Sequence, residues 1–283
     1  MRIGKTTIDE DHIGDFARKG FTWPVGIAVS TNGTIFCSDE YENAITSYDP
    51  DGIKNFPEFD PEGESLTRWG TQGSEPGHLN GPAGIEFDNE DNLLVVDKGN
   101  NRVQKFTKNG EYLIGWGKHG DGPGEFDEPW GITVDGTGDV YVADWGNDRV
   151  QKFSPDGTHI RTFGSSEGDE LDHPAGVAVD SDGDVYVTDW GNKRVQIYEQ
   201  DGEIITALYG DVHDLSKAGE YILNRDPEFK KTFNSVEHAM SSTSRFFRPC
   251  GITMAKDDRV VITDISGRLL VYDKDNDYAV PSV

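Results

Sequence analysis

Metal binding is the first chemistry that the side chains of this chain suggest. Of its seven histidines, His78 and His173 lie just before predicted strands, while His213 and His238 lie in a segment that interrupts the strand pattern. Imidazole is a common ligand of Zn²⁺. However, no two of these histidines have the spacing of a preformed site, such as one helical turn. We therefore expect no resident cofactor, and a zinc site at these four histidines is the alternative.

A second candidate for metal chemistry is the acidic run from Asp180 to Asp184. The run Asp-Ser-Asp-Gly-Asp resembles the start of a calcium-binding loop. Such a loop needs a bidentate glutamate at its twelfth position, which here is Gly191. The run also falls where a tight turn between strands is expected, so we interpret it as a hairpin turn. No catalytic triad, Walker loop or dinucleotide fingerprint is found, and catalytic residues remain unassigned.

Tryptophans and lysines in the predicted turns are the best candidates for recognition. Trp145 and Trp190 directly follow an aspartate that recurs along the chain, and Trp130 stands at the entrance to a strand. Lys98 and Lys193 lie on corresponding turns. An exposed tryptophan is favourable mainly where it meets a partner. We expect these five residues to form a ligand-binding face, and packing of the tryptophans within the protein is the alternative.

The elements that position these residues are short predicted strands. The stretch 128–164 contains four of them, at 129–135, 139–144, 149–153 and 160–164. Each is β-branched or aromatic and is bounded by Gly, Asp, Asn or Pro, as is typical of strands joined by tight turns. Four such strands predict an antiparallel meander. A sheet this small cannot bury both faces alone and has to stack on copies of itself.

Copies of this unit recur with strict spacing. Five prolines each precede an apolar strand, and an aspartate follows each of them after fifteen residues. The pairs are Pro24 and Asp39, Pro82 and Asp97, Pro129 and Asp144, Pro174 and Asp189, and Pro249 and Asp264. The repeated Asp and the Arg that opens the third strand recur in most copies, so we interpret them as structural. The period of about 45 residues predicts the blades of a β-propeller.

These residues resemble the NHL repeat, in which Pro-x-Gly precedes a strand, a second strand ends in Asp, and Asn-x-Arg-Val opens a third. Similar repeats occur in animal TRIM-NHL proteins and in peptidyl-hydroxyglycine lyase. The resemblance implies an all-β propeller, typically with six blades. The lyase branch uses zinc, but no motif here allows its histidines to be carried over. Some animal NHL proteins bind nucleic acid, and one fold hosts many unrelated sites.

The resemblance predicts one propeller domain over residues 1–283. Residues 2–16 align without a gap to residues 149–163, so the chain starts at the third strand of a repeat. We expect six blade positions with one incomplete, and five blades is the alternative. A missing upstream segment would explain the incomplete blade. Residues 211–247 have apolar residues at helical spacing and predict a helical insertion, either a lid over the face of the post-Asp turns or a cover for a blade edge.

Composition narrows the partner classes. The net charge of −26 should repel phosphate backbones, so we expect no nucleic-acid partner. No long apolar run predicts a membrane span or a secretory signal, and we expect a soluble protein with no membrane partner. The two cysteines, Cys37 and Cys250, predict free thiols in a reducing cytoplasm. Nothing in the sequence indicates the oligomeric state.

Together these features predict a binding or scaffold protein rather than an enzyme. Its loops would recognise a protein or a small molecule on a rigid framework of strands. The alternative is a metal-dependent lyase or a lactonase-type hydrolase that acts at the channel mouth. A metal bound by His or carboxylate side chains would distinguish the two.

Overall fold

The computed structural model describes residues 22–48, 65–164, 168, 170–210, 245–255 and 258–274. These residues form β-strands and two three-residue 3₁₀ helices, and no α-helix is found among them. Within the same ranges, no helix has the length and apolarity needed to cross a membrane. The chain divides into two compact units, residues 1–130 and 131–283, which are described separately.

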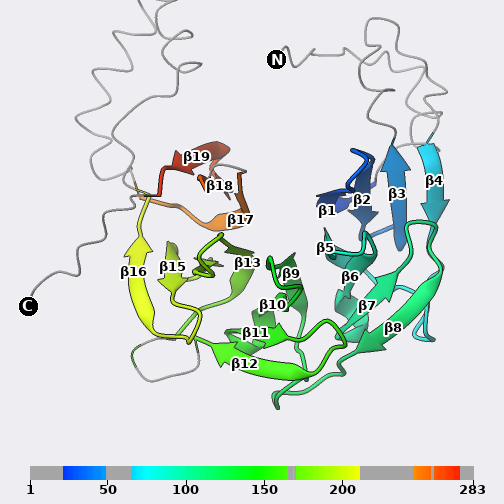
Figure 1. Ribbon diagram of the computed structural model, residues 1–283, viewed down its shortest axis with the longest axis horizontal. Coiled ribbons are helices and arrows are strands. Elements are labelled where there is room, and N and C mark those ends of the chain that lie inside the picture. The colour runs from blue at the N-terminus through cyan, green and yellow to red at the C-terminus, as the bar shows by residue number, and fades with distance from the viewer. Residues whose placement is uncertain are drawn as a thin grey trace, which may run out of the picture. The chain divides into compact units, whose positions relative to one another are not determined.

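The first unit contains two four-stranded antiparallel sheets with their strands in sequence order (Figure 1). The first sheet consists of β1 (Pro24–Val29), β2 (Ile35–Asp39), β3 (Ala44–Tyr48) and β4 (Ser65–Trp69). The second consists of β5 (Pro82–Phe87), β6 (Leu93–Asp97), β7 (Arg102–Phe106) and β8 (Tyr112–Trp116), and the 3₁₀ helix η2 (Lys98–Asn100) joins β6 to β7.

The second unit contains three sheets of the same kind. The first consists of β9 (Pro129–Val134), which begins at the unit boundary, β10 (Val140–Asp144), β11 (Arg149–Phe153) and β12 (His159–Phe163), with η3 (Trp145–Asn147) between β10 and β11. The next consists of β13 (Pro174–Val179), β14 (Val185–Asp189), β15 (Arg194–Tyr198) and β16 (Ile204–Leu208). The last has three strands, β17 (Pro249–Met254), β18 (Val260–Asp264) and β19 (Arg268–Tyr272).

The blade count corrects the sequence-based expectation. The prediction of propeller blades is confirmed, but the described residues form five of them, so the expected six-bladed arrangement is not supported. The reason is that one blade needs one Pro-to-Asp interval, which builds its first hairpin, and the chain has five such intervals. The half-repeat at residues 2–16, which led us to expect a sixth position, has no such interval and lies outside the described residues.

The predicted helical insertion at residues 211–247 also gains no support. Residues 211–244 lie outside the described residues, and residues 245–248 form irregular chain that leads into β17. The helical spacing of apolar residues that suggested this insertion is a local pattern, which does not by itself establish a helix. The assignment of residues 1–283 to one domain remains a prediction.

The glycine of Pro-x-Gly is required by the close approach of neighbouring blades. A Cβ atom on Gly26 of β1 would lie 2.5 Å from the carbonyl oxygen of Ala83 in β5. In the second unit, a Cβ on Gly131 would lie equally close, 2.5 Å, to the carbonyl oxygen of Ala175. Real Cβ atoms do not approach backbone oxygens this closely. The repeat therefore keeps glycine here so that first strands of adjacent blades can pack backbone to backbone.

Apolar side chains between consecutive blades form the core. In the first unit, Phe36 and Ile45 of one blade pack with Leu93 and Phe106 of the next. The second unit has two such clusters, one of which includes Tyr141, Val150, Phe163 and Tyr198, while the other includes Tyr186, Ile197, Phe246 and Ile262. The second strands of the three central blades, β6, β10 and β14, are buried at every position. Hydrophobic burial between blades thus holds the turns that carry the candidate site.

Glu86 of β5 is an exception to the apolar pattern of the first strands. The other four copies place Ala28, Thr133, Ala178 and Thr253 at this position. Burial raises the pKa of Glu86 to about 7, although the Phe87 N–H donates a hydrogen bond of 2.9 Å to Glu86 Oε1 and opposes the shift. The ionised form is therefore disfavoured in the folded protein.

We expect Glu86→Gln to stabilise the protein only at neutral and alkaline pH. Because the folded-state pKa lies above the ordinary value of 4.5, the folded protein retains a proton that the unfolded chain releases. The wild type therefore loses stability as pH rises from 4.5 through about 7. Thermal unfolding of both proteins should agree near pH 4.5 and differ by about 3 kcal/mol at pH 8. A difference independent of pH would contradict this assignment.

Candidate functional site

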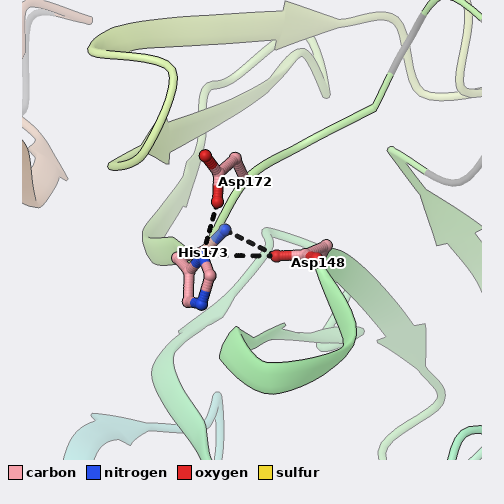
Figure 2. A group of neighbouring side chains, drawn as sticks. All are labelled: Asp148, Asp172 and His173. Atoms are coloured by element: carbon pink, nitrogen blue, oxygen red, sulfur yellow. Dashed lines mark hydrogen bonds and ion pairs between the residues drawn. The ribbon is translucent and has the colours of Figure 1, made fainter.

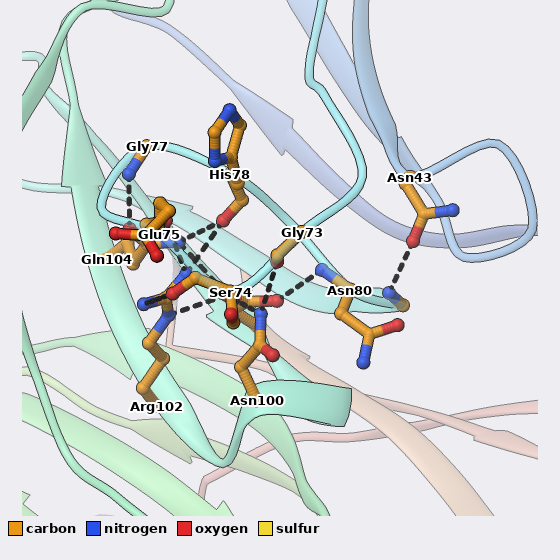
Figure 3. A network of polar contacts seen from close by, with 12 residues as sticks. Asn43, Gly73, Ser74, Glu75, Gly77, His78, Asn80, Asn100, Arg102 and Gln104 are labelled. Carbon is orange, nitrogen blue, oxygen red and sulfur yellow. Dashed lines mark hydrogen bonds and ion pairs between the residues drawn. The ribbon is translucent and has the colours of Figure 1, made fainter.

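The repeated aspartate organises the turn at the end of each second strand. Asp97 is fully buried, and its carboxylate accepts hydrogen bonds from the Asn80 N–H at 2.6 Å, Asn100 Nδ2 at 2.8 Å, Arg102 Nε at 2.7 Å and Gln104 Nε2 at 3.0 Å. Figure 3 shows part of this network around Asn100, Arg102 and Gln104. The carboxylate thereby ties its own turn to the segment that enters the blade.

Arg102, at the start of β7, binds the same segment. Its guanidinium donates to the carbonyl oxygens of Ser74 at 2.7 Å, Glu75 at 3.0 Å and His78 at 2.8 Å (Figure 3). His78, predicted as a possible metal ligand, is thus held through its carbonyl. Among the described residues it joins no group of potential metal ligands. The network recurs at Asp144 and Asp189, which supports the structural interpretation of the Asp–Arg pair.

The calcium-like run is a hairpin turn, as predicted, and a lysine occupies its centre. The Asp180 N–H donates to the Asp184 carbonyl at 3.1 Å, which closes the turn. Lys274 Nζ lies 2.5 Å from Asp180, 2.8 Å from Asp182 and 3.1 Å from Asp184. Burial lowers the pKa of Lys274, but hydrogen bonds to the three carboxylates outweigh it and raise that pKa overall. The ammonium therefore occupies the position between the carboxylates that suggested calcium.

In the first unit, Lys98 and Trp130, two residues of the predicted ligand-binding face, contact each other. Lys98 Nζ lies 4.5 Å from the centroid of the Trp130 ring. The same ammonium forms an ion pair with Glu40, so its charge is neutralised within the protein. Lys98 therefore contributes a cation–π contact to the framework rather than a free charge.

In the second unit, Trp145 and Trp190 lie side by side with ring centroids 5.1 Å apart. The imidazole of His173 packs edge-on against Trp145 at 5.0 Å and lies 6.4 Å from Trp190. On Trp190, the guanidinium carbon of Arg248 lies 3.6 Å from the ring centroid. Both tryptophans are half-buried. These residues form a continuous aromatic and cationic surface on one unit.

The residues that differ from blade to blade meet at the junctions between blades. We define a junction triad as the residue before the third strand of a blade and the two residues before the proline of the next blade. The four triads are Asn43, Asn80 and Gly81; Asn101, Asp127 and Glu128; Asp148, Asp172 and His173; and Lys193, Phe247 and Arg248. The first two lie in the first unit and the last two in the second. The conformation is shared, because the four leading residues have φ between 52° and 58°.

In three triads the side chain of the leading residue accepts a hydrogen bond from a backbone N–H at the entrance to the next blade. We call this hydrogen bond the latch. Asn43 Oδ1 accepts the Gly81 N–H at 2.8 Å, and Asn101 Oδ1 accepts the Glu128 N–H at 2.8 Å. Asp148 Oδ1 accepts the His173 N–H at 2.7 Å. In the fourth triad, Lys193 has no acceptor atom in its side chain and cannot form this bond.

At this fourth junction the latch is replaced by cations on aromatic rings. Lys193 Nζ lies 5.7 Å from the ring centroid of Phe247, and the Phe247 side chain is 56% exposed. Among the residues that the structure describes, Lys193 and Arg248 form cation–π contacts and no ion pair with an acidic side chain.

The backbone of the fourth triad is nevertheless well fixed. Asp264 accepts the N–H groups of Phe247 at 2.7 Å and Arg248 at 3.1 Å. Burial raises the pKa of Asp264, but hydrogen bonds from Ser266 and from these N–H groups outweigh it and lower that pKa overall. The carboxylate therefore stays ionised and holds the backbone from which Arg248 reaches over the Trp190 ring.

The third triad brings a predicted metal candidate next to two carboxylates (Figure 2). His173 Nδ1 is hydrogen-bonded to Asp172 Oδ1 and lies 3.7 Å from Asp148 Oδ1. One potential ligand atom from each residue lies within 4.8 Å of the others. All three side chains are about half exposed.

Sequence reasoning missed four residues of these two triads. It selected Trp145, Trp190, Lys193 and His173, but not the partners that the structure places beside them, which are Asp148, Asp172, Phe247 and Arg248. The available signal was the variation of these positions between otherwise constant repeats. The candidates His213 and His238 lie outside the described residues.

Comparison with known proteins supports the repeat assignment. The NHL repeat profile matches residues 79–106, 126–153 and 171–198. These ranges cover most of the second, third and fourth blades and include their repeated Asp and Arg. Comparison with curated proteins found no match.

Solved structures of similar fold include both enzymes and binding proteins. Virginiamycin B lyase from Staphylococcus aureus is 17% identical with a TM-score of 0.55, over 90% of this chain and 71% of that one. A gluconolactonase from Xanthomonas campestris is 16% identical with a TM-score of 0.53, over 89% and 76%. Nidogen, solved in complex with laminin, is 16% identical with a TM-score of 0.54, over 88% and 75%. At these identities the likeness shows the propeller fold alone.

Proposed function

Because this chain is a β-propeller of NHL repeats, we propose that it is a non-enzymatic binding protein that recognises an anionic group on a protein or small-molecule partner. The binding surface consists of Trp145, Trp190, Lys193, Phe247 and Arg248. The observation that carries the proposal is the fourth junction, where the latch is absent and two cations lack acidic partners among the described residues.

The chemistry of this surface suits a carboxylate or a phosphate. A guanidinium stacked face-on against Trp190 keeps its N–H edge free to form paired hydrogen bonds. The Lys193 ammonium adds a second positive charge beside it. The ring of Phe247 supplies apolar area for the part of the ligand that carries the anion.

The charge of the whole protein makes these two cations informative. With a net charge of −26, the chain has twice as many acidic as basic residues, 52 against 26. A basic residue in such a protein readily finds a carboxylate, as Lys98 and Lys274 do. Lys193 and Arg248 instead lie on aromatic rings. Repulsion at long range then selects ligands with a compact anionic group rather than a polyanion such as nucleic acid.

We expect anionic aromatic probes to bind this surface through Arg248 and Lys193. Benzoate and phenyl phosphate should shift the indole N–H resonance of Trp190, whereas neutral benzamide should bind more weakly. Arg248→Gln and Lys193→Gln should each reduce affinity by about tenfold, since a hydrogen bond to a charged group contributes about 1.5–3 kcal/mol. The measurement is an NMR titration of the ¹⁵N-labelled protein, and comparison of the two probes distinguishes carboxylate from phosphate.

The matched control is Arg68→Gln, which removes a positive charge in the first unit from an arginine paired with Glu42 at 3.0 Å. It should leave the affinity within twofold, because this exposed charge is already paired with Glu42 and is screened by salt. Equal binding of benzoate and benzamide, or an unchanged affinity in the Arg248 and Lys193 variants, would refute the proposal.

A metal-dependent lyase or lactonase-type hydrolase is the second candidate function. The observation that favours it is the third junction triad, in which His173 lies beside Asp148 and Asp172. This function requires that activity on a simple lactone such as dihydrocoumarin depend on added metal and disappear in His173→Ala. Absence of metal-dependent turnover leaves binding as the better-supported function.

A further inference from the structure

We propose that Asp148, Asp172 and His173 form a binding site for a divalent transition-metal ion such as Zn²⁺. The inference does not depend on the anion-binding function, because it concerns a different junction triad. Asp148 directly follows η3, and Asp172 and His173 directly precede β13. All three residues belong to the second unit. Figure 2 shows the two carboxylates directed at the same imidazole nitrogen.

The donor set and its spacing fit such an ion. Zn²⁺ is bound by imidazole nitrogen and carboxylate oxygen at about 2.0–2.2 Å, which places ligand atoms of a tetrahedral site about 3.3–3.6 Å apart. His173 Nδ1 and Asp148 Oδ1 are 3.7 Å apart. Asp172 lies closer to Nδ1 and has to rotate slightly, which its half-exposed side chain allows. Three protein ligands leave a fourth position for water or a ligand.

Metal binding at this site breaks the hydrogen bond between His173 Nδ1 and Asp172 Oδ1. The ion takes the Nδ1 lone pair and one oxygen from each aspartate, so the ring carries its proton on Nε2. A neutral ring protonated on Nδ1 moves that proton to Nε2 and releases none, whereas a doubly protonated ring releases one to solvent.

The negative charge of Asp148 is not needed for the fold. Its structural role is to accept the N–H of the next blade, and Asn43 and Asn101 perform that role as neutral amides with bonds of 2.8 Å. In the same way, Asn80 occupies the position of Asp172 in the first triad. Only the third triad combines two carboxylates with a histidine. A ligand role accounts for this combination, whereas the latch does not.

Neighbouring groups hold the potential ligands in place. The edge-on contact with Trp145 restricts the His173 ring. Gly191 donates its N–H to the Asp172 carbonyl at 2.8 Å, and a Cβ on Gly191 would lie 2.1 Å from the Asp172 carboxylate. Such support outside the ligand set is typical of metal sites, because it fixes the orientation of the ligands.

Isothermal titration of the full chain with Zn²⁺ alone tests the site. We expect one ion bound per chain. Asp148→Asn and Asp172→Asn place the asparagine of the first triad at each position, so they should fold normally and weaken binding at least about tenfold. His173→Ala should abolish binding, and the ¹⁵N resonance of His173 Nδ1 should move on metal addition in the wild type.

Asp127→Asn is the matched control. It removes the carboxylate that lies 3.5 Å from His119 Nδ1 and occupies the position of Asp172 in the second triad. Zn²⁺ affinity should stay within twofold in this variant. Wild-type affinity in both Asp148→Asn and Asp172→Asn, or no binding by the wild type at micromolar Zn²⁺, would overturn the proposal even if the anion-binding surface is correct.

Discussion

Asp97→Ala is expected to lower the free energy of unfolding by about 3–5 kcal/mol, the range for breaking a buried ion pair by removing one partner. The Asp97 carboxylate is fully buried and accepts hydrogen bonds from a backbone N–H and from the side chains of Asn100, Arg102 and Gln104. Alanine leaves these donors without their acceptor and leaves the guanidinium without its counter-charge. Chemical denaturation of both proteins measures the effect.

Two variants separate this network from a general charge effect. Glu111→Ala removes the same charge from an exposed side chain in the same blade and should change stability by less than about 0.5 kcal/mol. Asp97→Asn keeps one oxygen acceptor and should give an intermediate loss. If Asp97→Ala were no more harmful than Glu111→Ala, the repeated aspartate would not be the organising residue of the turn.

Lys152→Met is expected to lower the free energy of unfolding by about 3 kcal/mol or more, because the change leaves buried carboxylates without their cation. The Lys152 side chain is 6% exposed, and its Nζ lies 2.9 Å from Asp139 and 3.4 Å from Asp135. The ammonium also lies 4.9 Å from the centroid of the Tyr141 ring. Lys152 thereby joins the third strand of the blade to the turn between the first two.

The destabilisation by Lys152→Met should shrink in acid. Burial raises the pKa of Asp135, but hydrogen bonds from Thr137 and Asp139 and the charge of Lys152 outweigh it and lower that pKa overall. The ion pair therefore stabilises the fold above the ordinary carboxyl pKa of 3.8, and this contribution is lost as pH falls through the lower folded value. Unfolding measured between pH 7 and pH 3 checks the trend.

Lys118→Met is the control for this prediction. Lys118 forms an ion pair with Glu125 at 3.0 Å, but its side chain is 76% exposed. Exposed ion pairs contribute about 0–1 kcal/mol, so this variant should retain nearly full stability. A similar loss in both variants would show that burial of the Lys152 pair is not what makes it stabilising.

In other blades, too, a lysine forms an ion pair with the acidic turn between the first two strands, but the lysine does not always come from the same position. Lys105 occupies the position of Lys152 in the second blade and lies 3.0 Å from Asp88. The fourth blade has Ile197 at this position, and its acidic turn receives Lys274, which follows the last strand. Alignment of the repeats shows the missing lysine at residue 197. Only the folded chain shows which cation replaces it.

The sequence by itself determined the blade and the number of its complete copies. Each hairpin and its Asp–Arg network lie within a short stretch that the fifteen-residue interval marks, and alternating apolar residues specify the strands locally. The expectation of six blades came from a half-repeat and from the typical count of the family, which are weaker signals than the five complete intervals. The interpretation of the acidic run at 180–184 as a turn was also local, and it was confirmed.

Only the tertiary structure decided which variable residues meet. The latch partners are 25 residues apart at the third junction and 38 apart at the first, because loops of different length separate them. Spacing along the chain therefore could not pair Asp148 with His173 or Lys193 with Phe247. These contacts arise because the first strands of adjacent blades pack backbone to backbone, which brings the end of one hairpin against the entrance of the next blade. The candidate sites lie where the framework is constant and the side chains are free to differ.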